Sequence, residues 1–194
     1  WHRNFRLLKL VAIPSMLLTA VIQSAEWLGR VLVARGPEGF GQVAIFSAAQ
    51  SIATITQLGP GQITNASLPI MTGLQSHGEI VTFRSTLIRT TMLVLLCGLS
   101  VAVLIAAGSK HLMGLYGETF ADNNHVLLVL AGTYGVTVIT MVWGAALIAA
   151  GQTWSQFFQK TLWGGVMIGA TYMLSGQGAL GLAYAYAIGN GVLT

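Results

Sequence analysis

The stretch LIRTTMLVLLCGLSVAVLIAA at residues 87–107 contains one charged residue, Arg89, and consists mainly of leucine, valine, isoleucine and alanine. It has the length of about 20 residues that an α-helix needs to cross the hydrocarbon core of a bilayer. Because that core offers no water to the backbone, a segment that crosses it must bond its own peptide groups, as a helix does. The stretch therefore predicts a transmembrane helix.

Five further apolar stretches have the same character, and short links such as GSKHLMGLYGETFADNN (108–124), with turn residues, join them. They lie at residues 7–33, 42–63, 126–150, 157–174 and 180–194, and a continuation of the second to residue 71 is an open alternative. We predict an all-α integral membrane protein in which residues 1–194 form a single six-helix transmembrane bundle. Because the chain opens at Trp1 and ends at Thr194 within an apolar run, we expect a fragment of a longer protein.

The composition favours a lipid environment. Of the 194 residues, 54% are hydrophobic and only 7% are charged, with a mean hydropathy of +0.72, whereas soluble domains carry roughly 25% charged residues. The formal net charge is +4. No basic patch is interleaved with aromatic residues, so we expect no nucleic acid partner.

Sequence motifs for catalysis and metal binding are missing. The chain has no GxSxG, HExxH, P-loop or CxxC pattern, and its four histidines do not have the spacing of metal ligands. The single cysteine, Cys97, excludes an internal disulfide. We therefore predict no enzymatic activity, no metal and no cofactor.

The basic residues predict the orientation of the chain, because lysine and arginine are commoner in cytoplasmic loops. With a cytoplasmic N-terminus, the inner side holds Arg3, Arg6, Lys9, Arg84, Arg89 and Lys160. The outer side then holds Arg35 and Lys110, with Arg30 near the outer end of its helix. This asymmetry predicts a cytoplasmic N-terminus.

Polar side chains form lines on three of the predicted helices. The lines are Ser15, Thr19, Gln23, Glu26 and Arg30 on the first; Ser47, Gln50, Thr54, Gln57 and Gly61 on the second; and Thr133, Thr137, Thr140 and Gly144 on the fourth. Such lines indicate either hydrogen bonds between helices or a water-filled cavity. For the threonines we favour the structural interpretation over a cavity, because a threonine hydroxyl can also bond its own helix backbone. For the glutamines both interpretations stay open.

Glu26 and Arg30 lie four residues apart inside an apolar stretch. Ionised groups in a membrane span are costly and mark a transport pathway or a pair, and residues at this spacing can pair on one helix face. We favour a functional role, with a purely structural pair as the alternative. We also predict a break of the second helix at LGPGQ (58–62), because Pro60 removes a backbone hydrogen bond there.

Several segments together resemble one protein family. They are IPSMLLTAV (13–21), GPEGFGQVAIFSAAQSI (36–52), ASLPIMTGLQSHGE (66–79), LMGLYGETF (112–120) and ALIAAGQT (146–153). In this order and spacing they resemble the polysaccharide flippases, the O-antigen unit translocases of the multidrug/oligosaccharidyl-lipid/polysaccharide exporter superfamily. The resemblance is to the C-terminal half of such a transporter and covers nearly the whole chain.

The resemblance implies one half of a two-bundle transporter of the bacterial inner membrane. It would move undecaprenyl-pyrophosphate-linked oligosaccharide units to the outer leaflet by alternating access, and polysaccharide polymerase machinery would be a partner. Arg30 would then bind the pyrophosphate, the glutamines Gln23, Gln50 and Gln57 would bind the sugars, and Glu26 would couple H⁺ or Na⁺ or hold Arg30. A single arginine is a sparse cationic site for such a family.

Two alternatives remain open at this stage. One is a drug/cation antiporter of the same superfamily, in which Glu26 binds a proton or Na⁺. The other is a non-transporting membrane partner of polysaccharide assembly. Independently of these alternatives, we expect Glu26, Gln23, Gln50 and Gln57 to face a shared interior cleft between helices rather than lipid.

Overall fold

The computed structural model of the protein describes residues 12–36 and 39–192, and within these ranges the chain is helical and contains no strand. The longer helices are α2 (Ile13–Ala34), α3 (Gly39–Ala53), α4 (Leu58–Ser76), α5 (Ile80–Ala107), α8 (Asn124–Ala149), α9 (Thr153–Leu174) and α10 (Gly178–Gly191). The short elements are η2 (Thr54–Gln57), α6 (Ser109–Gly114), α7 (Glu118–Asp122) and η3 (Ser175–Gln177). The predicted all-α class is confirmed for this part of the chain.

Three of the described helices, α2, α5 and α8, are long and apolar enough to cross a membrane. They correspond to the predicted stretches 7–33, 87–107 and 126–150. The other predicted stretches also fall on helices, and the second continues through α3, η2 and α4. That these helices cross a membrane too, as a six-helix transmembrane bundle requires, remains a prediction.

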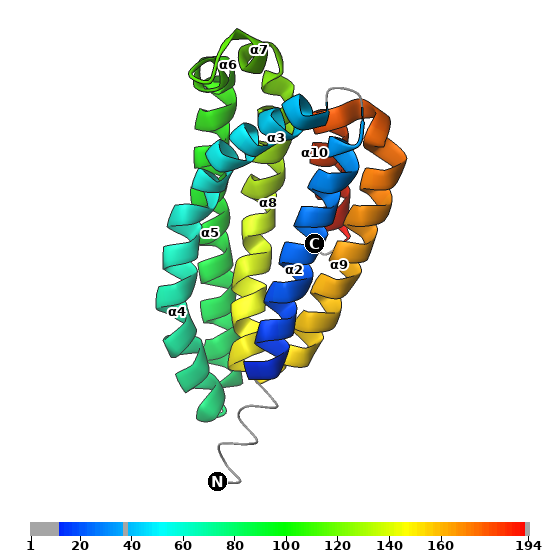
Figure 1. The fold of residues 1–194 in the computed structure, drawn as a ribbon. Coiled ribbons are helices and arrows are strands. Elements are labelled where there is room, and N and C mark those ends of the chain that lie inside the picture. Colours follow the sequence, from blue (N-terminus) through cyan, green and yellow to red (C-terminus); the bar gives the residue numbers. More distant parts are fainter. Residues whose placement is uncertain (1–11, 37–38, 193–194) are drawn as a thin grey trace.

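The long helices lie side by side and pack in two groups (Figure 1). In one group α8 contacts α5 and α4, and in the other α9 contacts α2 and α10. Helices α3 and α10 join the groups, because both also contact α8. Although α8 and α9 follow each other in the chain, they make few contacts, and both line cavities between the groups.

Glycines allow α5 and α8 to approach closely. A methyl group on Gly135 would lie 2.8 Å from the Cβ of Ala102, and one on Gly98 would lie 2.9 Å from Val138. Small residues at helix contacts are typical of helices that associate in lipid, where the hydrophobic effect does not drive helices together. The α5–α8 contact therefore depends on these two glycines.

The chain bends between α3 and α4, and the bend lies at η2 rather than at the predicted residues 58–62. Pro60 has no N–H for the carbonyl of Thr56, and its ring would clash with that carbonyl in a regular helix. The turn before Pro60 therefore tightens into a 3₁₀ helix, and α3 runs obliquely to α4 (Figure 1). The predicted break was one turn too late, because proline disturbs the residues that precede it.

The predicted link 108–124 contains two short helices instead of turns alone. Gly117 separates α6 from α7 with a φ of 127°, a conformation that favours glycine. The rings of Tyr116 and Phe120 pack against each other across this point, with centroids 5.9 Å apart. The link thus forms a compact cap at one end of the long helices (Figure 1).

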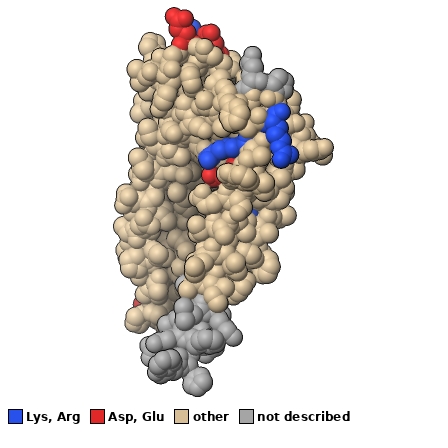
Figure 2. Space-filling model, viewed as in Figure 1, with Lys and Arg blue, Asp and Glu red and all other residues tan. Residues whose placement is uncertain are grey.

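Charged side chains are sparse on the face drawn in Figure 2, and acidic ones gather at the end where α7 lies. Large apolar side chains are exposed along α5, among them Met92, Leu96, Val103 and Leu104. An apolar exterior of this kind suits contact with lipid. Of the charges used to predict orientation, Arg3, Arg6 and Lys9 lie outside the described residues.

We predict that Gly135→Ala destabilises the protein by about 1–3 kcal/mol, because the new methyl group meets the Cβ of Ala102, which cannot rotate away. Gly132→Ala is the matched control on the same helix, since its methyl group would meet no atom within 4 Å. Thermal unfolding of the purified variants in detergent measures the difference. Equal stability of the two variants would contradict the close α5–α8 contact.

The orientation can be tested with single cysteines in a Cys97→Ala background. The links after α4 and α8 lie at one end of the helices, whereas α6, α7 and η3 lie at the other (Figure 1). We expect a membrane-impermeant maleimide to label Lys110→Cys and Gly176→Cys in intact cells. Gln75→Cys and Gln152→Cys should react only after permeabilisation. The opposite pattern would refute a cytoplasmic N-terminus.

Candidate functional site

A cavity of about 360 Å³ lies where the two helix groups meet. Its walls come from α2, α3, η2, α8, α9 and α10. The lining residues are Ile22, Glu26, Gln50, Thr54, Gln57, Tyr134, Thr137, Thr140, Met141, Lys160, Trp163, Tyr186 and Asn190. The volume falls in the range of about 300–1,000 Å³ that is usual for small-molecule sites, and most of the lining side chains carry a polar atom.

The predicted pair on α2 is present. Arg30 Nη2 lies 3.4 Å from Glu26 Oε2, and the same nitrogen donates a hydrogen bond of 2.9 Å to Gln50 Oε1 on α3. Glu26 lines the cavity, but Arg30 is not among the lining residues. The guanidinium thus ties α2 to α3 beside the cavity, and its role as a binding group for pyrophosphate stays a prediction.

Gln50 connects three helices. Its Oε1 accepts from Arg30 on α2, and its Nε2 donates to the hydroxyl oxygen of Tyr134 on α8 at 3.1 Å. Because arginine can only donate hydrogen bonds, the contact with Arg30 sets the orientation of the Gln50 amide. Its oxygen faces Arg30, and its NH₂ group faces Tyr134. Glu26, Arg30, Gln50 and Tyr134 therefore form one polar chain along a wall of the cavity.

Of the four residues predicted to share a cavity, three line the same one: Glu26, Gln50 and Gln57. Thr54 lies between the two glutamines and also lines it, while its hydroxyl donates to the carbonyl of Ser51 at 2.8 Å. In the described part of the chain, Gln57 shows no side-chain hydrogen bond. Its amide is therefore available to a ligand. That either glutamine binds sugar remains a prediction.

The prediction that Gln23 faces the same cavity is wrong. Gln23 is exposed and is not among the lining residues, whereas its neighbour Ile22 is. In an α-helix each residue turns by about 100°, so Gln23 is rotated by about 60° from Glu26 and by about 100° from Ile22. Ile22 and Glu26 lie on the side of α2 that faces the cavity. Gln23, three residues before Glu26, lies outside that side.

The threonines of α8 bond their own helix, as predicted. The hydroxyl of Thr133 donates to the carbonyl of Val129 at 2.7 Å, and that of Thr140 donates to the carbonyl of Thr137 at 2.7 Å. The hydroxyl of Thr137 is 3.3 Å from the carbonyl of Tyr134. Thr137 and Thr140 also line the cavity, so the bonds to the backbone do not remove them from its surface.

Lys160 is a cationic residue of the cavity that the sequence interpretation assigned to the cytoplasmic side. It lies in α9 and lines the cavity, half-buried, with its Nζ 5.8 Å from the centroid of the Trp163 ring. It also lines a second cavity, of about 400 Å³, between α8 and α9. The sequence did carry a signal for this position. Lys160 lies inside the apolar stretch 157–174, where a charged side chain is as costly as Glu26 is in its own stretch.

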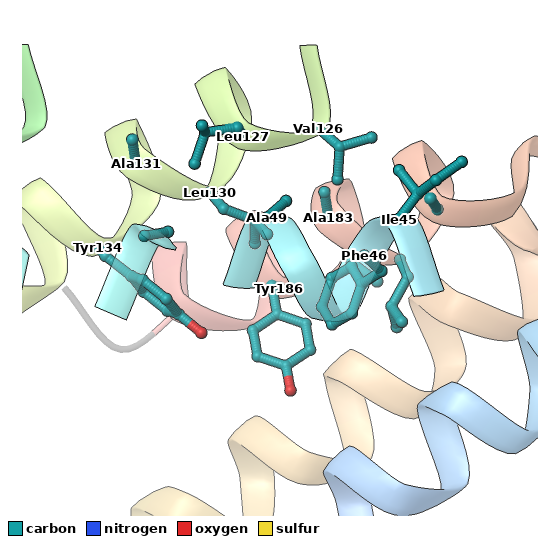
Figure 3. Packing of buried hydrophobic residues seen from close by; sticks show 14 of the residues in the cluster. Ile45, Phe46, Ala49, Val126, Leu127, Leu130, Ala131, Tyr134, Ala183 and Tyr186 are labelled. Atoms are coloured by element: carbon teal, nitrogen blue, oxygen red, sulfur yellow. The ribbon is translucent and has the colours of Figure 1, made fainter. Parts of the chain in front are cut away.

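Trp163 and Tyr186 form an aromatic wall that the sequence did not reveal. The two rings meet at 85° with centroids 6.0 Å apart, and both residues line the cavity. Phe46 of α3 also packs against Tyr186, with ring centroids 5.5 Å apart. Figure 3 shows the hydroxyls of Tyr134 and Tyr186 pointing to the same side, away from the apolar packing of α3, α8 and α10. Nothing in the sequence marks Trp163 or Tyr186 as a cavity residue.

Two polar atoms of this wall have no hydrogen-bond partner. Trp163 Nε1 and the hydroxyl oxygen of Tyr186 are buried and unpaired within the described chain. Both side chains are almost wholly buried, with 5% of Trp163 and 2% of Tyr186 exposed. Unpaired buried donors are uncommon because each costs about 1–3 kcal/mol. Both residues line the cavity, but these two atoms are enclosed by the packing around them.

The chemistry of the cavity is that of a binding site. It offers the Glu26 carboxylate, the Lys160 ammonium, amides, hydroxyls and two kinds of aromatic ring. Among the described residues, no group of three or more His, Cys, Asp or Glu side chains could hold a metal ion. The arrangement suits recognition of a polar molecule with hydrogen-bonding edges.

No protein-family model, curated protein or solved structure matches this chain.

We predict that Gln50→Leu lowers the stability of the protein by about 1–3 kcal/mol, because it leaves the buried Tyr134 hydroxyl and an Arg30 N–H without partners. Gln57→Leu is the control, since Gln57 lines the same cavity without such bonds. Chemical unfolding in detergent gives both values. If Gln57→Leu loses as much stability as Gln50→Leu, then the chain through Gln50 does not hold the helices together.

Proposed function

We propose that this chain is one half of a polysaccharide flippase. In this proposal it forms a six-helix transmembrane bundle in the bacterial inner membrane, with its N-terminus in the cytoplasm. Together with a second bundle, it moves undecaprenyl-pyrophosphate-linked oligosaccharide units to the outer leaflet by alternating access. The observation that carries the proposal is the cavity lined by several polar side chains between helices with an apolar exterior.

The cavity lining fits a sugar better than a purely apolar molecule. Sugars present hydroxyl groups that both donate and accept, and the amides of Gln50 and Gln57 can do the same. The flat faces of sugar rings are apolar and pack on aromatic rings such as those of Trp163 and Tyr186. Polar groups placed among membrane helices are costly, so their concentration around one cavity favours a transport pathway.

The resemblance of the sequence to polysaccharide flippases supports the same function. The segments that carry it, such as GPEGFGQVAIFSAAQSI, include α3 and therefore Gln50. In this proposal the chain is not an enzyme and needs no cofactor. A non-transporting role in polysaccharide assembly would leave the polar cavity without a use.

The drug/cation antiporter is the second candidate, and Glu26 is the observation that favours it. Glu26 is the acidic residue of the cavity lining, and it shares its cationic partner Arg30 with Gln50. A carboxylate in such a place can take up a proton or Na⁺ and release it when its environment changes. This function predicts efflux of organic cations that is lost in Glu26→Gln.

The test of the flippase is export of lipid-linked sugar units by cells that carry the full transporter, normalised to its abundance in the membrane. We expect Gln57→Leu to reduce export roughly two- to tenfold, the effect of one lost hydrogen bond to the ligand. Gln23→Leu is the matched control, because Gln23 is exposed outside the cavity. The control should export normally.

Normal export by Gln57→Leu at normal abundance would refute a sugar-binding role of the cavity. Cation efflux that depends on Glu26, together with no effect of any cavity variant on sugar export, would favour the antiporter. The two functions are thus separated by the transported molecule and by the residue on which transport depends.

A further inference from the structure

Helix α5 carries a continuous apolar stripe on its exposed side, opposite the face that packs on α4 and α8. The stripe consists of large side chains that are each at least 39% exposed: Ile88, Met92, Leu96, Leu99 and Val103. Their spacing of three or four residues places them on one face of the helix. From Ile88 to Val103 the stripe is about 22 Å long, which exceeds the roughly 15 Å of hydrocarbon that one leaflet supplies. It is therefore long enough to lie along an acyl chain.

Two exposed arginines flank this α5 stripe near the beginning of the helix. At about 100° per residue, Arg84 is rotated by about 80° to one side of Met92, and Arg89 by about 60° to the other side. Ile88 lies between the two directions. The arginines are also about 7 Å apart along the helix axis. Their long side chains can therefore approach one group from two sides, above the end of the stripe.

The apolar stretch 87–107 determines the depth of the two arginines. As a helix it is about 31 Å long, which matches a hydrocarbon core of about 30 Å. Leu87 then lies at the boundary of the core, on the side of the link between α4 and α5. Arg84 is about 4.5 Å outside this boundary and Arg89 about 3 Å inside it. Because an arginine near the boundary extends its charged end toward the headgroups, both guanidinium groups lie at the level of lipid phosphates.

The protein itself does not use these charges. Neither Arg84 nor Arg89 forms an ion pair or a hydrogen bond with another described side chain. Glu79, the acid of the adjoining link, is exposed and has no cation within 4.0 Å among the described side chains. Helix α5 also lines neither of the two cavities described above. Two unpaired cations beside an apolar stripe are complementary to an amphiphile with an anionic head.

We propose that Arg84 and Arg89 bind the headgroup of an anionic phospholipid whose acyl chains lie along the α5 stripe. A guanidinium group matches the oxygens of a phosphate in a bidentate geometry, and such charged hydrogen bonds are the strong ones. A zwitterionic lipid is disfavoured, because its own ammonium group is repelled by the arginines. In the predicted orientation the lipid belongs to the cytoplasmic leaflet. The site requires only that α5 crosses a membrane, whatever molecule the protein transports.

Quenching of a fluorophore by brominated lipids tests the site. A bimane label is attached to Met92→Cys in a Cys97→Ala background. The full-length protein is then reconstituted in mixtures of phosphatidylglycerol and phosphatidylcholine, one of which has brominated chains. We expect a local preference for phosphatidylglycerol of about three- to tenfold at this position. Phe158→Cys is the control position, exposed near the same end of α9, and it should show no preference.

Charge variants are then measured with the label at Met92→Cys. We expect the double variant Arg84→Gln with Arg89→Gln to lose the preference. The double variant Arg84→Lys with Arg89→Lys should keep only part of it, because an ammonium group lacks the planar fork. Arg35→Gln with Lys110→Gln is the matched control, since it removes two exposed cations that lie on α6 and at the end of α2. This control should keep the full preference.

All variants are compared at equal yield of monodisperse labelled protein, so that a folding defect is not counted as lost binding. Equal quenching by the two lipids at the α5 label would overturn the proposal. A preference that survives in the double glutamine variant would do the same, and so would an equal preference at the α9 control position. Export of sugar units does not enter this test, so the lipid site and the proposed function can fail separately.

Discussion

A polar side chain among apolar helices must find a partner, because neither lipid nor a packed apolar interior can replace the hydrogen bonds of water. This constraint divides the polar residues of the protein into two groups. The hydroxyls of threonine and serine turn back to the carbonyls of their own helices, as Thr133 and Thr140 do. Side chains that are too long for this reach other helices, and they determine how the helices meet.

Gln50 shows how far one such side chain can organise the fold. Its amide receives Arg30 from α2 and donates to Tyr134 of α8, so it joins elements from both helix groups at the edge of the cavity. Trp163 and Tyr186 also line the cavity and contribute rings to the packing, while Trp163 Nε1 and the Tyr186 hydroxyl oxygen stay unpaired. The cavity lining thus contains side chains whose polar atoms are paired within the protein and side chains whose polar atoms are not.

Several features could be predicted from the sequence because they depend on local spacing. The long apolar runs indicate α2, α5 and α8, and residues four apart indicate the contact of Glu26 with Arg30. The bonds of the α8 threonines also follow from local geometry. The position of Gln50 and Gln57 in one cavity with Glu26 could be predicted too, because each lies on a regular polar line.

Other features depend on how helices are placed relative to each other, which one sequence does not give. Gln23 belongs to the same polar line as Glu26, but the rotation of α2 turns it outward. Lys160 lies close enough to a predicted helix end to pass for a cytoplasmic charge, and only the packing of α9 places it in the cavity. For Tyr134 and Tyr186 the sequence carries no signal, since an aromatic residue in an apolar helix is equally compatible with the core and with lipid.

The 3₁₀ turn η2 has a consequence for the size of the cavity. Residues in a 3₁₀ helix rise by about 2.0 Å each instead of the 1.5 Å of an α-helix, so the four residues of η2 are about 2 Å longer than the same residues in an α-helix. Gln50 precedes this turn and Gln57 closes it. Pro60 excludes the α form here, because its ring would clash with the carbonyl of Thr56. The separation of the two amides is therefore set by the backbone of this turn.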